Sequence, residues 1–150
     1  MDDNHTTKLS SAGLVYKHFG RDIIRTILKN TDETSSCSPL NDEVLNALYY
    51  KLYRDFMEHI DAIDNGISVS VGEPRYHIST TLSSRVGRFN PSWNEPQSTD
   101  IFNEQFSKAM ILTGSEFLSH LESLTNSWWP ARSIVIDALE RRFDIVQEGT

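Results

Sequence analysis

The sequence predicts an all-α fold of about five helices. Apolar residues recur three or four positions apart over long segments, as they do on the buried face of a helix. Capping residues flank these segments, and runs with the two-residue alternation of a strand are few. The 150 residues, 38% of them hydrophobic, are enough for one compact domain. We expect a disordered N-terminus at residues 1–8, one helical domain at 9–145, and a tail at 146–150.

The first helix is expected from about Ser10 to Asn30. Ser10 or Ser11 can cap its N-terminus, and its apolar stripe has i, i+4 spacing. Gly13 and Gly20 lie inside this helix. Each lowers helix stability by about 1 kcal/mol relative to Ala. A small residue also permits close backbone approach, so both glycines indicate a packing face. A Ser/Thr-rich loop follows at 31–39.

The second helix is expected from about Leu40 to Asp64, and Asn65-Gly66 is typical of a left-handed C-cap. Its last turn contains two carboxylates, Asp61 and Asp64. At about 100° per residue, Asp64 projects onto the flank of the apolar face and Asp61 projects further toward solvent. We therefore expect Asp64 to be half-buried and Asp61 to be the more exposed of the two.

The second half of the chain is predicted to contain three more helices. After a loop at 67–76, with a short extended piece at 67–71, a short helix is expected at about 79–89. The prolines of the segment 90–96 end it and form a rigid loop. A long helix is expected at about 99–126. The last helix is expected to start at Pro130, because proline is favoured in a first helical turn.

Composition excludes several classes of protein. The net charge of −7 argues against a protein that coats nucleic acid by bulk charge. It is compatible with a nuclease that holds its substrate through a metal and a few arginines. Cys37 is the single cysteine, so no intramolecular disulfide can form, which fits a reducing compartment. The start of the chain lacks the apolar region of a secretory signal, and no apolar stretch approaches the roughly 20 residues of a membrane span.

The two acids at the end of the second helix are candidate metal ligands. A helix C-terminus carries partial negative charge, so acids there suggest a nearby cation. Asp64 can ligate a hard divalent metal through its oxygens. The alternative is structural: Asp-Asn-Gly is ordinary turn chemistry, and Asp64 can pair with one of three arginines, Arg75, Arg85 and Arg88.

A local basic cluster lies in this acidic protein, formed by Arg75, His77, Arg85 and Arg88. Guanidinium groups bind phosphate in a bidentate manner, so the cluster is a candidate phosphate site. The alternative is salt bridging to acids of the second helix. Trp128 and Trp129, before Pro130, are typical of a packing anchor, with stacking on a nucleic-acid base as the alternative.

Four segments of the sequence resemble the MYG family, named from a melanocyte proliferating gene. They are Thr-Lys-Leu-Ser-Ser-Ala-Gly-Leu-Val-Tyr-Lys-His-Phe-Gly at 7–20, Asp-Ala-Ile-Asp-Asn-Gly-Ile-Ser at 61–68, Leu-Ser-Ser-Arg-Val-Gly-Arg-Phe-Asn-Pro-Ser-Trp-Asn at 82–94, and Ser-Trp-Trp-Pro-Ala-Arg-Ser at 127–133. Their order and spacing agree with that family over residues 7 to 145. The combination is highly specific, although each segment alone is weak.

The resemblance implies the central part of an α/β phosphoesterase similar to the DHH group, with 3′-5′ exoribonuclease activity and a mitochondrial or nuclear location. It implies a pair of divalent ions, manganese or magnesium, that cleave a phosphodiester bond in single-stranded RNA. By position, Asp64 or Asp61 matches the last metal-binding aspartate. Family members carry their other metal motifs upstream of the segment that here starts at Thr7, so most ligands are absent.

Two hypotheses of function follow. In the first, the chain is a fragment or shortened relative of such a hydrolase and is inactive alone, since it keeps about one metal ligand. In the second, it is a non-catalytic helical module that self-associates or pairs with a full-length relative or another protein, through apolar faces left exposed. A weaker third option is a scaffold whose arginines bind phosphate without cleavage.

Overall fold

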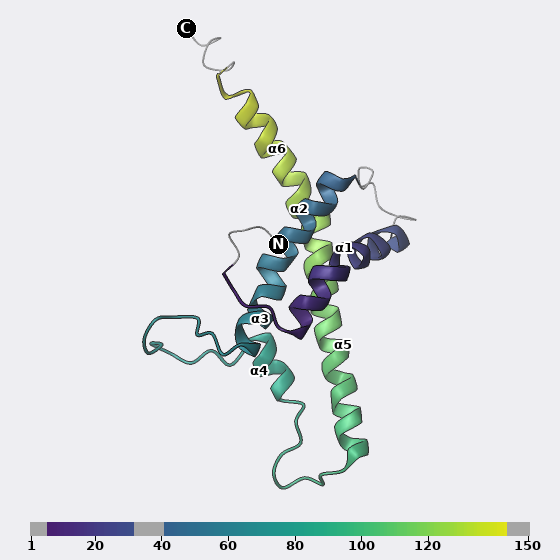
Figure 1. The fold of residues 1–150 in the computed structure, drawn as a ribbon, viewed down its shortest axis with the longest axis vertical. Helices are drawn as coiled ribbons and strands as arrows, with labels where there is room; N and C mark the ends of the chain where they lie inside the picture. Colours follow the sequence, from purple (N-terminus) through teal and green to yellow (C-terminus); the bar gives the residue numbers. More distant parts are fainter. Residues whose placement is uncertain (1–5, 32–40, 144–150) are drawn as a thin grey trace.

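The computed structural model describes residues 6–31 and 41–143, and it confirms the all-α prediction (Figure 1). No strand occurs in these described ranges. The helices, in chain order, are α1 (Ser11–Thr31), α2 (Asp42–Leu52), η1 (Tyr53–Met57), α3 (Glu58–Asp64), α4 (Leu82–Gly87), α5 (Thr99–Ser123), η2 (Leu124–Trp128) and α6 (Trp129–Glu140). The labels η1 and η2 denote π-helical turns. The predicted tail at 146–150, most of the 31–39 loop and residues 1–5 of the predicted disordered segment lie outside the described ranges.

The caps of these helices follow the expected chemistry. Ser10 caps α1, because its Oγ accepts a hydrogen bond from the backbone N–H of Gly13 at 3.2 Å. At the end of α3, Gly66 has a φ of 68°. The backbone N–H groups of Gly66 and Ile67 donate to the carbonyls of Ile63 and Ala62, at 3.0 and 2.9 Å. This is the Schellman arrangement that Asn65-Gly66 predicts.

The predicted second helix is one continuous rod, α2–η1–α3, with a π-helical turn in its middle. The backbone N–H of Glu58 donates to the carbonyl of Tyr53, five residues earlier. Such a turn holds one residue more than an α-helical turn needs. Every residue after it is therefore rotated by about one position, roughly 100°, relative to an uninterrupted helix.

The predicted extended piece at 67–71 is not a strand in the structure.

The last two predicted helices are joined in the structure, which corrects the expected break between Asn126 and Pro130. α5, η2 and α6 follow one another without a loop, and α6 projects beyond the other helices (Figure 1). Pro130 has no N–H, and its ring would collide with the carbonyl four residues earlier in a regular helix. The widened turn η2, where the N–H of Trp129 donates to the carbonyl of Leu124, comes directly before it. A π-helical turn lets the helix pass the proline instead of ending there.

The core lies where α1 and the start of η2 meet the α2–η1 rod. Tyr16 and Tyr49 are buried and stack with their ring centroids 4.9 Å apart. The Tyr16 hydroxyl donates to the carbonyl of Tyr49 at 2.9 Å. Gly20 permits this contact, since a Cβ there would lie 2.9 Å from the Tyr49 ring. The prediction that this glycine marks a packing face is confirmed. Trp128 and Trp129 also pack against the core, as the packing-anchor interpretation predicts.

Within the described residues, no helix combines the length and apolar character needed to span a membrane. The amphipathic pattern instead leaves each rod with one face in the core. α1, α5 and α6 also carry many exposed apolar residues.

Candidate functional site

The carboxylate of Asp61 is completely buried between the last turn of the α2–η1–α3 rod and the first turn of α1. Its Oδ1 accepts hydrogen bonds from the backbone N–H of Ser10 at 2.9 Å and from the Ser10 hydroxyl at 2.6 Å. Its Oδ2 accepts one from the Tyr53 hydroxyl at 2.7 Å. Burial, together with this hydrogen bond, raises the pKa of Tyr53, so the phenol stays protonated and donates. Protein donors thus occupy three of the roughly four lone-pair sites of the Asp61 carboxylate.

The expected exposure of the two aspartates is therefore wrong: Asp61 is buried and Asp64 is exposed. The π-helical turn η1 is the physical reason. In an uninterrupted helix Asp64 would lie nearly above Tyr53. The rotation of roughly one residue position instead brings Asp61 above Tyr53, where their side chains form a hydrogen bond.

Gly13 completes the surroundings of Asp61. A Cβ at Gly13 would fall on the Asp61 carboxylate, so only glycine lets the first turn of α1 approach it. The approach matters because the N-terminal end of a helix carries partial positive charge. Acids at the end of the second helix suggest a nearby positive charge. For Asp61, the partial positive charge at the start of α1 takes that place.

Asp64 lies in a small pocket of about 190 Å³ between α3, α4 and α5. His59 lines the same pocket, with Ser83 and Thr113 contributing hydroxyl groups and Leu82 and Val86 an apolar wall. The sequence gives no reason to expect His59 here, because its spacing of two residues from Asp61 is not one that places two side chains on one helix face. Within the described part of the chain, the Asp64 carboxylate makes no hydrogen bond or ion pair.

These residues only partly fit a divalent metal pair. A carboxylate is a suitable donor for manganese or magnesium, whereas an imidazole is more typical of transition metals than of magnesium. However, the described residues contain no group of three or more His, Cys, Asp or Glu side chains that could hold one ion. Asp61 is already occupied by Ser10 and Tyr53. The predicted metal role of Asp64 stays a prediction, and the ligand set of a pair is incomplete here.

The structure does not gather the predicted basic cluster around Asp64. Arg85, on α4, forms an ion pair with Glu116 of α5 at 2.7 Å, not with an acid of the second helix. Arg88 donates to the backbone carbonyl of Ser79 at 2.8 Å. Arg75 and His77 are exposed in the segment between α3 and α4. Their proposed contact with phosphate is not tested by this arrangement.

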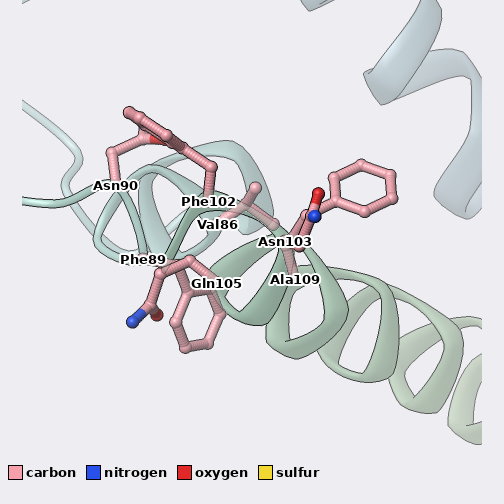
Figure 2. A pocket seen from close by; sticks show the side chains of 8 residues that line it. Val86, Phe89, Asn90, Phe102, Asn103, Gln105 and Ala109 are labelled. Carbon is pink, nitrogen blue, oxygen red and sulfur yellow. The ribbon is translucent and has the colours of Figure 1, made fainter. Parts of the chain in front are cut away.

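A second pocket, of about 370 Å³, lies where α4 ends and α5 begins. Figure 2 shows its lining: apolar and aromatic side chains such as Val86, Phe89 and Phe102 beside the amides of Asn90 and Asn103. Phe102 is exposed. Aromatic faces beside amides suit an unstacked nucleic-acid base. Sequence reasoning missed this pocket, although one Phe-Asn pair, at 89–90, follows the end of α4 and another, at 102–103, lies near the start of α5.

Comparisons with known proteins agree along the whole chain. The family model MYG1_exonuc, described as an uncharacterised protein family (UPF0160), matches residues 1–150. A MYG1 protein of Caenorhabditis elegans is 47% identical over 146 residues, which are 97% of this chain and 40% of that protein. The MYG1 exonucleases of mouse and human are 47% and 46% identical over 145 residues, 95% of this chain and 35% and 36% of those proteins. The chain thus spans well under half the length of these relatives. No solved structure matches it.

Replacing the buried carboxylate is expected to destabilise the fold far more than replacing the exposed one. Asp61→Ala leaves the Ser10 and Tyr53 donors without an acceptor, at about 1–3 kcal/mol for each buried group. We expect a loss of at least about 3 kcal/mol in the free energy of unfolding, measured by urea denaturation. Asp64→Ala is the matched control and should change stability by less than about 0.5 kcal/mol. Equal losses would contradict the assignment of the buried acid.

A methyl group at Gly13 is expected to disrupt the same contact. Overpacking costs about 1–3 kcal/mol, and Gly13→Ala also displaces a hydrogen-bonded carboxylate, so we expect a loss of at least about 2 kcal/mol. The control is Gly114→Ala in α5, where a Cβ would meet no atom within 4 Å. That variant should gain about 0.5–1 kcal/mol from helix propensity. Thermal unfolding of both variants checks this, and a neutral Gly13→Ala would show that α1 can move away from Asp61 freely.

Proposed function

The chain belongs to the MYG1 family, and on that premise we propose that it is a segment of a metal-dependent 3′-5′ RNA exonuclease that is inactive on its own. The observation that carries this proposal is the match of 95% of the chain to relatives named MYG1 exonuclease, at 46–47% identity. Because the chain spans 35–36% of those two relatives, their whole activity cannot simply be transferred to it.

The geometry supports a place for substrate beside Asp64. The pocket that holds Asp64 and the pocket of Figure 2 share the side chain of Val86, so they adjoin one another along α4. Arg85 and Arg88 come from this same short helix and the residue that follows it. An RNA strand could therefore place a base in the aromatic and amide pocket, with its phosphate near the arginines and the scissile bond toward Asp64.

The number of metal donors supports the proposed inactivity of the isolated chain. Cleavage by a metal pair needs several protein ligands, and the described residues bring only His59 and Asp64 to one pocket. Asp61 serves the fold instead. We therefore propose that any manganese or magnesium bound in a family member is held mainly by residues outside this segment, with Asp64 as this segment's contribution. The mitochondrial or nuclear location expected from the resemblance stays a prediction.

The purified chain is expected to leave 5′-labelled single-stranded RNA intact in the presence of manganese. Calorimetric titration with manganese should show no binding tighter than about 10 micromolar, or roughly −7 kcal/mol. The controls are Asp64→Ala, which removes the pocket acid, and Asp137→Ala, which removes an exposed acid on α6. Cleavage that requires metal, disappears in Asp64→Ala and persists in Asp137→Ala would contradict the proposed inactivity.

Any affinity of the chain for RNA is expected to depend on Arg85 and Arg88. For single strands, the slope of log K against log salt is about −0.7 for each neutralised phosphate. Replacing both arginines with Ala should therefore reduce its magnitude by about 1.4. The charge-matched control, Arg25→Ala with Arg141→Ala, should change it little. Equal slopes in both double variants, measured by fluorescence anisotropy, would remove these arginines from the proposed site.

A second candidate function is favoured by the exposed apolar surface. A helical module that pairs with another protein would need an uncharged face large enough to bind it. Exposed apolar side chains of α1 and α5, such as Val15 and Met110, line a surface hollow that has no charged side chain. The two candidates are compatible, because a segment inactive alone can act when it is packed against the groups that it lacks.

A further inference from the structure

A long apolar groove runs between α1 and α5. Its volume is about 830 Å³, and none of the side chains that line it is charged. Phe56, Met57 and Ile60 of the η1–α3 segment lie between the two walls. In a chain with a net charge of −7, an uncharged hollow of this volume is a distinct feature.

The walls of the groove are exposed although they are apolar. Val15 on α1 is 54% exposed, and Met110 on α5 is 56% exposed. Ile23 and Phe106 extend the same two walls and are also exposed. Contiguous apolar patches of this kind mark surfaces that bind another protein surface. Burial stabilises by about 25 cal/mol for each Å² of apolar area removed from water.

We propose that this groove is covered by an apolar surface of the region that the longer MYG1 relatives carry outside the matched segment. The match includes 95–97% of this chain in three relatives, so it includes both walls. The same match takes up 35–40% of those relatives. More than half of each is therefore available to cover the groove within one molecule, where the effective concentration of the covering surface is high.

A second copy of the chain fits the groove less well. A two-fold dimer pairs the same patch with itself. Two concave grooves facing one another would enclose a void, and protein interfaces and interiors are close-packed. The occupant that fits is a convex, uncharged surface. The proposal rests on the family membership stated above but not on hydrolase activity, so its test uses no activity measurement.

The test compares the isolated chain with an exchange protein, in which this chain replaces the matched segment of the Caenorhabditis elegans relative. Single cysteines probe the walls in Val15→Cys and Met110→Cys. The neighbouring substitutions Leu14→Cys and Ile111→Cys are matched controls, because both residues are exposed and lie outside the groove. The rate of maleimide labelling is measured for each peptide by mass spectrometry, so that Cys37 and the cysteines of the relative do not interfere.

All four substituted positions should label readily in the isolated chain. In the exchange protein the two wall positions should label at least tenfold more slowly, while the two controls change less than twofold. Unchanged labelling of the walls, or equal protection of the controls, would overturn the proposal. So would an exchange protein that fails to fold by circular dichroism. Protection that already occurs in the isolated chain and rises with its concentration, with a dimer in sedimentation, would assign the groove to a second copy instead.

Discussion

The contact between Asp61 and the first turn of α1 fixes how the two N-terminal rods cross. Ser10 and Asp61 are 51 residues apart in the sequence, and two hydrogen bonds join them in the buried state. Taking a carboxylate out of water costs several kcal/mol, and hydrogen bonds to a charged acceptor return about 1.5–3 kcal/mol each. Three such bonds and the positive end of α1 together offset the cost of burial. A crossing at any other position would leave the charge uncompensated, so this contact specifies one arrangement of the rods.

The two acids at the end of the second helix differ in exposure in the opposite sense from the one that the sequence predicts, since Asp61 and not Asp64 is buried. Acids at the end of a helix do need a positive partner, and two acids near the end of α3 correctly indicated one. For Asp61 the structure supplies a helix N-terminus as that partner. An acidic pair at a helix end is therefore weak evidence for a metal, because a nearby helix start offers the same electrostatic compensation with no cation at all.

Local sequence signals predict the helices, but they do not predict which face of a helix each residue lies on after a π-helical turn. The apolar spacing, the cap at Ser10 and the Asn65-Gly66 turn are signals of a few neighbouring residues, and the structure bears them out. The sequence has no such local signal for the π-helical turn at Tyr53–Met57. This turn nevertheless rotates the later residues of the rod about the helix axis, so that Asp61 is buried and Asp64 is exposed. The turn at Leu124–Trp128 has a local cause in Pro130. Even so, a proline at this position is equally compatible with the start of a new helix. The pocket beside Asp64 depends on α4 and α5 packing near α3, which no spacing within one helix reveals.

The groove and the two pockets form one continuous surface, because Val86 lines all three. Ile60 and Thr113 line both the groove and the pocket of Asp64. A surface that covered the groove would therefore end at the edge of the Asp64 pocket. Any polar groups on that edge would face Asp64 and His59, which are too few to hold a metal pair by themselves. The packing of one surface against the groove would then both cover its apolar walls and add the missing metal donors beside Asp64 and His59. This would account for the presence of two acids with different roles close together in the sequence. The buried Asp61 holds the rods in place. The exposed Asp64 faces the surface where the rest of a longer protein would meet this segment.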